Sequence, residues 1–479
     1  MHYETIIGLE IHLELQTSSK LFCGCSTSFG QEANTNCCPV CLGLPGTLPV
    51  FNKRAIELAV TAALALNSDI QLQSRFDRKN YYYPDLPKAY QISQYEQPLA
   101  KGGYLEVEFE SGLRRINLER VHLEEEAGKL IHAGDSIFGA DYSLVDYNRT
   151  GIPLLEIVTA PDIRSGSEAR KFLETLRSIL LYSGASDCKM EEGSLRCDAN
   201  ISLRPVGSQG YGVKAEVKNM NSFRAVETAL YYEAKRQEKI LAGGGTVIQQ
   251  TCHWDEAEKI TIPIRSKEGS SDYRYFPEPD LLPLTLDKDF ISRIAESLPE
   301  MPGKRRARMA EHYGLGESEL DIFIENRPLA DFFEAAAEKY DDYKNLANWV
   351  QGDFLYQLRE NDKKPEEIKP ELFVELLTLL EKGQINRPVA KELLAEMIQN
   401  GSSPKELVEE KGLGRIAGGE KLIPLIEQVI AENPDAVENY RQGKEKAITF
   451  LVGRVMALTK GRADPGELNK LLREKISQQ

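Results

Sequence analysis

Residues 8–15, GLEIHLEL, alternate strictly between apolar and polar side chains. On a β-strand this period sets four aliphatic side chains on one face and a histidine between two acids on the other. The polar group consists of Glu10, His12 and Glu14. Plain solvation of one sheet face does not require such a group, so the stretch predicts a functional face. A sheet with one ordinary solvated side remains the alternative.

Two later stretches alternate in the same way and predict further strands of this sheet. In LRCDANISLR, residues 195–204, every second side chain is polar, and in VKAEVKN, residues 213–219, a lysine, a glutamate and a lysine share a face. The polar residues of these stretches are Arg196, Asp198, Asn200, Ser202 and Arg204, and Lys214, Glu216 and Lys218.

Carboxylates recur near these strands. HLEEEAGKL contributes Glu124, Glu125 and Glu126, IPLLEIV contributes Glu156, and KMEEGSLR contributes Glu191 and Glu192. Hard divalent ions such as Mg²⁺ take several oxygen ligands, and an active site that handles ATP uses the ion to bridge phosphates. Carboxylates gathered around His12 would supply those ligands. On a regular strand Glu125 would face away from Glu124 and Glu126, and a bulge would change this, so the choice of glutamate stays open.

Five of the eight cysteines fall within nineteen residues, in FCGC and NTNCCPVC. The spacing C-x-C, twelve residues, C-x-x-C is typical of a tetrahedral thiolate zinc site with Cys23, Cys25, Cys38 and Cys41 as ligands. A disulfide or a chance cluster is the alternative. Cys37 is the spare cysteine of the cluster, and the remaining three, Cys188, Cys197 and Cys252, are expected at buried or inert positions.

No glycine-rich phosphate loop of the Walker or dinucleotide type occurs in the sequence. If ATP binds, basic side chains and metal must hold its phosphates. The candidates are Lys79, Arg149, Lys189, Lys214, Lys218, Arg224 and Arg274. Each taken alone is more typical of a surface ion pair than of a phosphate ligand, whereas the set, embedded in turns rich in glycine and asparagine, is better evidence for phosphate binding. The turn-rich stretches 77–99 and 265–284 add tyrosines that could stack on a nucleotide or fill a crevice.

The formal net charge of −15 argues against binding of nucleic acid by the whole surface. From Arg441 to the end, however, nine basic residues stand against four acidic ones, so this tail carries +5. A polyanion held at one end is compatible with this, as is a solvated helical tail. The longest apolar run is too short to cross a bilayer and the N-terminus shows no secretory pattern, so a cytoplasmic location is expected.

The pattern of the chain predicts three domains. Strand-rich alternation extends over residues 1–294, and helical periodicity dominates from 295 onward. A second break at Ser402–Pro404 combines a serine N-cap with a proline at the first helical position. We therefore expect an α+β catalytic domain over 1–294, an all-α domain over 295–403 and a small all-α tail over 404–479.

At these residues the chain resembles the B subunits of the aspartyl/glutamyl-tRNA amidotransferases, essentially from end to end. The resemblance includes GLEIHLEL, KLFCGCSTSFG, CPVCLGLPGTLPV, YYYPDLPKAYQISQYEQPL, DYNRTGIPLLEIVTAPD, MEEGSLRCDANISLRP, EVKNMNSFRA and RSKEGSSDYRYFPEPDLLPL. The segment FLVGRVMALTKGRADP is similar to an end module found in other tRNA-associated proteins. Ala33, where many relatives have proline, and the variable Cys37 are departures that spare the four proposed zinc ligands.

The resemblance implies a glutamine synthetase-like cradle domain with an open, curved antiparallel sheet. It implies ATP-dependent phosphorylation of the side-chain carboxylate of glutamate on a glutamine tRNA, or of aspartate on an asparagine tRNA, followed by amidation with ammonia. It makes His12, Glu125 and Glu156 the leading magnesium ligands, with Glu10 and Glu124 next. The sequence holds no convincing glutaminase constellation, so an amidase subunit and a small third subunit are the implied partners, and the basic tail is implied to bind tRNA.

Three other functions are weighed against this one. A zinc-stabilised tRNA-binding scaffold without catalysis would need the cysteines and the tail but not His12 and the acids. A free-standing ligase for a small carboxylic acid would have no use for the tail. A zinc hydrolase is least favoured, because a four-thiolate site leaves no open position for water.

Overall fold

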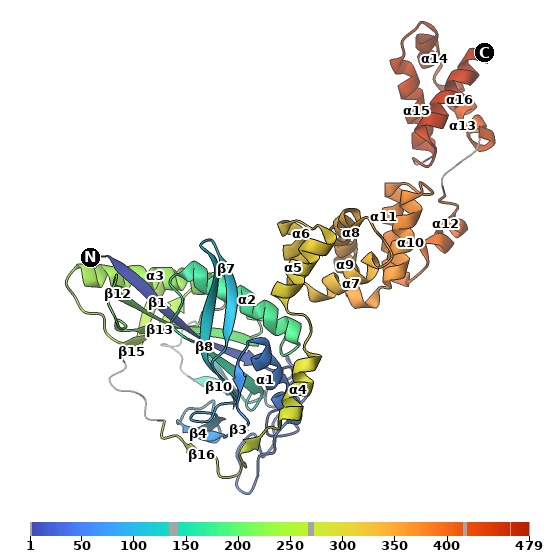
Figure 1. The fold of residues 1–479 in the computed structure, drawn as a ribbon. Helices are drawn as coiled ribbons and strands as arrows, with labels where there is room; N and C mark the ends of the chain where they lie inside the picture. The colour runs from blue at the N-terminus through green and yellow to red at the C-terminus, as the bar shows by residue number, and fades with distance from the viewer. Residues whose placement is uncertain (1, 134–141, 267–272, 415–418, 460, 479) are drawn as a thin grey trace. The chain divides into compact units, whose positions relative to one another are not determined.

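The computed structural model describes residues 2–133, 142–266, 273–414, 419–459 and 461–478. The chain forms two compact units, residues 1–304 and 305–479 (Figure 1). Residues 267–272 of the tyrosine-rich stretch and Lys460 of the basic tail lie outside the described residues.

The first unit is built on a ten-stranded open sheet. Its path is β15-β14-β13-β12-β1-β11-β8-β6-β2, with β7 paired to β8, and every pair is antiparallel except β13 with β14. The strands are β1 (Tyr3–Glu14), β2 (Asp69–Ile70), β6 (Ala100–Lys101), β7 (Tyr104–Phe109), β8 (Gly112–Glu125), β11 (Pro153–Thr159), β12 (Leu195–Pro205), β13 (Ala215–Lys218), β14 (Gln250–Asp255) and β15 (Ile260–Ser266).

Three small sheets accompany the main sheet. They pair β9 with β10, β4 with both β5 and β16, and β3 with β17. Their strands are β3 (Gln73–Ser74), β4 (Asp77–Asn80), β5 (Tyr90–Ser93), β9 (Lys129–His132), β10 (Ser143–Asp146), β16 (Phe276–Pro277) and β17 (Leu284–Thr285).

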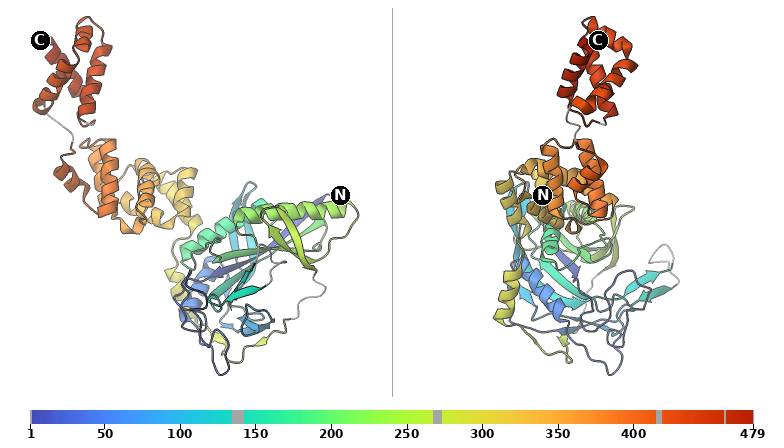
Figure 2. Two further views of the ribbon diagram at one scale, coloured as in Figure 1. Left: turned by 180° about the vertical axis from the view of Figure 1, so that it is seen from behind. Right: turned by 90° about the vertical axis from the view of Figure 1, so that its right-hand side faces the viewer.

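Helices cover the apolar face of the main sheet, whereas β4 and β5 face its polar side. The covering helices α1 (Lys53–Ala65), α2 (Gly166–Ser183) and α3 (Phe223–Ala242) contact strands of the main sheet, and Figure 2 shows α2 and α3 running along it. Along β1, Leu9, Ile11 and Leu13 are buried in the same hydrophobic core as these helices. Burial of each such side chain away from water stabilises the folded state by about 1.5–3 kcal/mol. The predicted alternation of β1 and β12 is confirmed.

The α2 helix shows why the chain folds locally as it does. Ser165 caps its N-terminus by accepting the amide of Glu168, and Gly184 ends it in the left-handed conformation. The last helix of the first unit is α4 (Lys288–Ser297), and it packs on α1.

The second unit is helical over its described residues. Its helices are α5 (Pro302–Tyr313), α6 (Glu317–Glu325), α7 (Arg327–Ala337), α8 (Tyr343–Trp349), η1 (Val350–Phe354), α9 (Leu355–Glu360), η2 (Pro365–Glu367), α10 (Pro370–Glu381), α11 (Arg387–Asn400), α12 (Pro404–Lys411), α13 (Gly419–Glu432), α14 (Pro434–Arg441), α15 (Lys446–Leu458) and α16 (Pro465–Gln478). One hydrophobic cluster spans residues 309–407 and a second spans 422–476.

The structure confirms the prediction of an α+β fold with an open sheet followed by a helical region. The predicted boundary at 294 falls inside α4, and the one at 403 falls on Ser403, which caps α12 ahead of Pro404 as expected. The division into three domains stays a prediction. Among the described helices, none combines the length and the apolar character that crossing a bilayer would require.

Candidate active site and metal centres

Three central strands bring two imidazoles and two carboxylates together on the polar face of the main sheet. His12 of β1 lies directly opposite Glu156 of β11, and Glu156 lies opposite His122 of β8. Glu124 follows two residues after His122, so it projects from the same face of β8. Strand register alone therefore assembles the group from three separate parts of the sequence.

The two histidines and two glutamates form a compact cluster, in which His122 and Glu124 are buried. The Nε2 atom of His12 is 3.5 Å from Glu156 Oε2 and 3.7 Å from Glu124 Oε1. The Nε2 atom of His122 is 3.3 Å from Glu156 Oε2 and 3.6 Å from Glu124 Oε2. The Ser93 hydroxyl donates to the same Glu124 Oε2 at 3.0 Å. One oxygen of Glu124 is thus engaged from the buried side, and the other faces His12.

Electrostatics keep both carboxylates ionised. Burial raises the pKa of Glu156, but the charges of His122 and His12 and their hydrogen bonds outweigh it, and the pKa lies well below the usual value. At Glu124, burial raises the pKa and the hydrogen bond with His122 lowers it. The net effect is again a lowered pKa. Burial lowers the pKa of His122, yet Glu156 and Glu124 raise it to about 9.

This donor set fits a divalent cation. One ligand atom each from His12, Glu124 and Glu156 lies within 4.8 Å of the others. Two carboxylates and an imidazole on a partly open face suit Mg²⁺ or Mn²⁺, which keep positions for phosphate oxygens and water. A bound cation would supply the positive charge that the carboxylates otherwise draw from the two imidazoles.

A cavity of about 360 Å³ opens over this cluster. Lys79 and Tyr81 enter it from β4 and the residue after that strand. Burial lowers the pKa of Lys79, but the carboxylates of Glu124 and Glu156 outweigh that effect and the pKa is raised, so the ammonium stays charged. The lining residues are His12, Lys79, Tyr81, Gln91, Glu124, Glu126, Ala127, Leu154, Arg196, Cys197, Asp198, Asn219, Met220 and Asn221.

Glu124, and not the expected Glu125, lies with His12 and Glu156 in this structure. The strand β8 is regular at this end, so consecutive glutamates point to opposite faces. Glu125 is buried with Lys88 as its ion-pair partner, and its Oε1 accepts the Ile92 amide at 2.9 Å. Its carboxylate therefore belongs to the far side of the strand.

Glu10 and several predicted phosphate ligands lie outside the cluster. Glu10 accepts from Asn200 Nδ2 at 2.9 Å and lines a separate cavity, of about 250 Å³, together with Lys214. Lys218 pairs with Asp198 at 2.5 Å, beside the main cavity. Arg149 is bound to Glu14 at 2.7 Å.

The remaining cations are not among the residues that line the main cavity. Lys189 pairs with Glu192 at 2.7 Å on the surface, and Arg224 is exposed at the start of α3. Arg274 has a positive φ of 45°, and its carbonyl accepts from Asn80 Nδ2 at 2.8 Å. Of the predicted phosphate ligands, Lys79 is the one that lines the main cavity.

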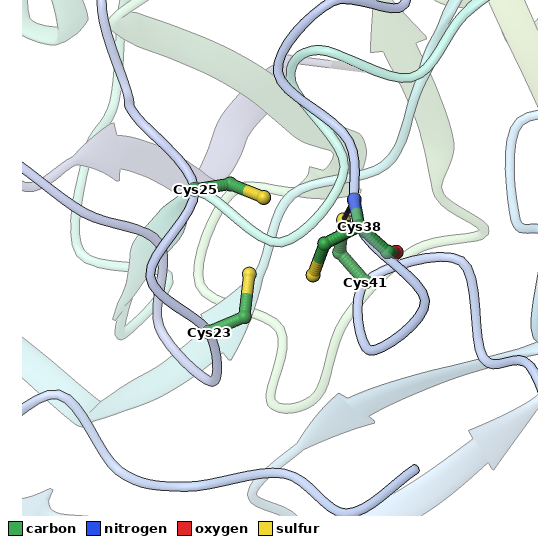
Figure 3. A group of neighbouring side chains, drawn as sticks. All are labelled: Cys23, Cys25, Cys38 and Cys41. Atoms are coloured by element: carbon green, nitrogen blue, oxygen red, sulfur yellow. Dashed lines mark hydrogen bonds between the residues drawn. The ribbon is translucent and has the colours of Figure 1, made fainter.

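The four predicted zinc ligands also come together. One segment carries Cys23 and Cys25 and another carries Cys38 and Cys41, and their thiols converge (Figure 3). The four sulfur atoms lie within 4.8 Å of one another, and all eight cysteines are free of disulfides. Four convergent sulfurs without other donors fit a tetrahedral Zn²⁺ site. Cys188, Cys197 and Cys252 are buried elsewhere, as expected.

Neighbouring thiols shift one another's pKa in opposite directions, so they compete for deprotonation. A hydrogen bond from Cys23 lowers the pKa of Cys41 to about 4, helped by the Cys38 amide and by Lys20. The pKa of Cys23 rises in turn, mainly through its hydrogen bond with Cys41, and burial raises that of Cys25 to about 11. A cation would relieve this competition by favouring the thiolate form of every cysteine.

Sequence reasoning gives no role to His122 or Ser93, and it includes Tyr81 only among the tyrosines of residues 77–99. The alternation of β8 was available as a signal, since residues 122 and 124 must share a face once the strand is regular. Ser93 and Tyr81 reach the site from a separate small sheet, and no local pattern in the sequence marks that approach.

Comparison with known proteins extends these observations to the whole chain. Residues 5–292 match the family model described as the GatB/GatE catalytic domain, and residues 331–476 match the one described as the GatB domain. The four thiols and the His12 cluster both lie within the first matched range.

Curated relatives are similar over essentially their full length. The chain is 53% identical to a protein of Caldanaerobacter subterraneus over 100% of both chains, and 52% identical to one of Carboxydothermus hydrogenoformans over 99% of both. It is 48% identical to a protein of Brevibacillus brevis over 99% of both. Each of the three is named as the B subunit of an aspartyl/glutamyl-tRNA(Asn/Gln) amidotransferase. The chain therefore belongs to the family of aspartyl/glutamyl-tRNA amidotransferase B subunits.

Proposed function

We propose that this chain activates the side-chain carboxylate of glutamate or aspartate misacylated onto glutamine or asparagine tRNA, using ATP, and converts it to the amide. The observation that carries the proposal is the cluster of His12, Glu124 and Glu156 at the base of a cavity that also holds Lys79. The names of the relatives supply the tRNA substrate. The open sheet with its polar face would then serve as a glutamine synthetase-like cradle.

Each residue of the cavity has a distinct role in this proposal. His12, Glu124 and Glu156 would hold Mg²⁺, and the ion would offset charge on the transferring phosphoryl group. Lys79 supplies a fixed positive charge near the same point, and Arg196 lines the cavity from β12. Tyr81 and Asn219 on the cavity wall would help to keep bulk water away from the activated acyl group.

The proposed reaction has two steps. An oxygen of the side-chain carboxylate attacks the γ-phosphorus of ATP, ADP leaves, and an acyl phosphate forms. Ammonia then attacks the acyl carbon, phosphate leaves with the former carboxylate oxygen, and one proton from the nitrogen is lost. An amidase subunit would deliver the ammonia from glutamine, and a small third subunit would complete the assembly.

The other parts of the chain take supporting roles in this proposal. The four cysteines would bind Zn²⁺ and hold the segment of residues 23–41 in place without taking part in the chemistry. The helices after Arg441, where the tail carries +5, would contact the tRNA backbone. A cytoplasmic location stays a prediction.

Amidation of glutamyl-tRNA with ammonium chloride as nitrogen source tests the function, because free ammonia bypasses the amidase. Glu124→Gln in the assembled complex should lower the rate by about 100-fold or more, since it removes a ligand charge from the metal cluster. Glu108→Gln removes an exposed carboxylate from β7 and is the matched control. Equal rates for both variants, with tRNA still bound, would favour a noncatalytic tRNA-binding scaffold.

A further inference from the structure

Lys20 is a lysine with no exposed surface beside the four-cysteine centre. Its exposed fraction is 0%, although lysine is almost never fully buried without a charged partner. Its Nζ donates to the Asn36 carbonyl at 2.7 Å and to the Tyr147 carbonyl at 3.3 Å. The third contact of Nζ is the Cys41 sulfur at 3.7 Å.

No carboxylate oxygen lies within 4.0 Å of the Lys20 ammonium in the part of the chain that the structure describes, although Glu125 lines the same cavity. Lys88 and Glu125 form an ion pair at the wall of this small cavity, which Lys20 also lines. Among the described residues, no ion pair within 4.0 Å includes Lys20. Two backbone carbonyls satisfy donors but carry no net charge. Leaving a buried charge uncompensated is strongly unfavourable, so Lys20 requires an anion nearby.

The cysteine cluster is the group in contact that can supply that anion. Four neutral thiols, or two disulfides, would give Lys20 nothing to balance. Four thiolates around Zn²⁺ carry excess negative charge, which a nearby ammonium stabilises. The two carbonyls hold Nζ in position, so the positive charge stays next to Cys41.

We propose that Lys20 is the fixed counter-charge of the four-cysteine centre and that its ammonium strengthens zinc binding by offsetting the excess negative charge of the zinc–thiolate group. The inference rests on the zinc centre of the proposed function and not on the amidation chemistry. It makes Lys20 a positioning residue that acts on the metal through charge. Partners of this kind typically change metal affinity by about 10- to 100-fold.

The test measures Zn²⁺ affinity of the full-length chain by competition with a chromophoric chelator. Lys20→Met keeps the length and apolar stem of the side chain but removes the charge, and it should weaken zinc binding by about 10- to 100-fold. Lys20→Gln keeps an N–H donor for the carbonyls and should fail to restore affinity. Lys53→Met removes a lysine that is 84% exposed in the same part of the chain and should leave affinity unchanged.

A second measurement separates charge from packing. The melting temperature of each variant is compared with zinc loaded and after chelation. Loss of the counter-charge should lower the stabilisation that zinc provides, whereas loss of packing alone would destabilise both forms equally. Wild-type zinc affinity in Lys20→Met, or recovery of affinity in Lys20→Gln, would overturn the proposal. A wild-type chain that binds no zinc would overturn it too, while leaving the amidation experiment valid.

Discussion

Glu124 is held between two imidazoles and a hydroxyl, and this environment decides which of its oxygens faces the cavity. Ser93 and His122 both engage Oε2, while Oε1 lies toward His12. His122 is only 2% exposed, so its imidazole cannot turn to solvent. His122 therefore acts on the cluster by fixing the carboxylates.

Replacing His122 should weaken metal binding without removing a ligand. In His122→Asn, the two carboxylates lose the imidazole that holds them in position, and we expect Mn²⁺ affinity to fall by about 10-fold or more. Electron paramagnetic resonance of Mn²⁺ bound to the full-length chain measures this, with His132→Asn, on the small sheet β9/β10, as control. Unchanged Mn²⁺ affinity in His122→Asn would mean that the carboxylates are positioned by the backbone alone.

At the scale of single residues, the sequence predicted ligand types better than ligand identities. His12 lies in the cluster, on a strand whose strict alternation predicts a polar face. Glu156, which the resemblance implies, also lies in the cluster, although its strand β11 does not alternate. Glu125 is implied by the resemblance, and the residues themselves leave the choice of glutamate open, because three successive glutamates carry no sign of where a strand ends or bulges. Only the hydrogen-bond register of β8 with β11 assigns Glu124 to the polar face.

At the scale of elements, an ion-pair network ties α7 to α5 in the second unit. Glu334 of α7 contacts Arg305 and Arg308, and Arg305 also binds Asp331 at 2.6 Å. Burial raises the pKa of Glu334, but the hydrogen bond from Arg308 and the charges of both arginines outweigh it, so the pKa is lowered. The ion pairs of Glu334 with the two arginines therefore stabilise the folded state at neutral pH.

Glu334→Gln should lower the free energy of unfolding of the second unit by about 2 kcal/mol at pH 7. Because the folded pKa lies below the usual value of 4.5, this difference is present above that pH and is lost as the pH falls toward the folded pKa. Urea unfolding followed by Trp349 fluorescence in a Trp254→Phe background reports on this unit. Glu338→Gln, exposed at the end of α7, is the control and should change stability by under about 0.5 kcal/mol. A difference that does not shrink as the pH falls below 4.5 would exclude an ionised Glu334 as its cause.

Secondary structure was predictable where one face of an element is buried. The β1 and β12 strands and the start of α12 could be read from alternation and from the Ser403–Pro404 cap. The small strands β4 and β5 could not, because Asp77–Asn80 and Tyr90–Ser93 lack alternation and are placed by long-range pairing. These two strands nevertheless position Lys79 and Ser93, so this part of the site could not be predicted from the sequence pattern.

At the scale of the whole molecule, an acidic chain ends in basic helices. Arg454 of α15 and Lys470 of α16 are exposed. If the tail contacts the tRNA backbone, replacing both by glutamine should weaken tRNA binding. The slope of log affinity against log salt should become shallower by about one to two.

Filter binding at several salt concentrations measures this effect on the tail. Replacing the exposed Lys344 and Lys382 by glutamine removes the same charge elsewhere and should leave the slope unchanged. At saturating tRNA, the rate of amidation should be equal in all three proteins, since none of the changes touches the cavity. An unaltered slope in the tail variant would show that the tail does not contact tRNA through these two residues.

The most direct test of the account follows one oxygen atom. Glutamyl-tRNA with ¹⁸O in the side-chain carboxylate is incubated with ATP, ammonium chloride and the complex, and the released phosphate is examined by mass spectrometry. The account predicts ¹⁸O in the phosphate for the native chain and for Glu108→Gln, and little phosphate of either kind for Glu124→Gln. Phosphate without ¹⁸O alongside normal amide formation would contradict activation by phosphorylation of the carboxylate.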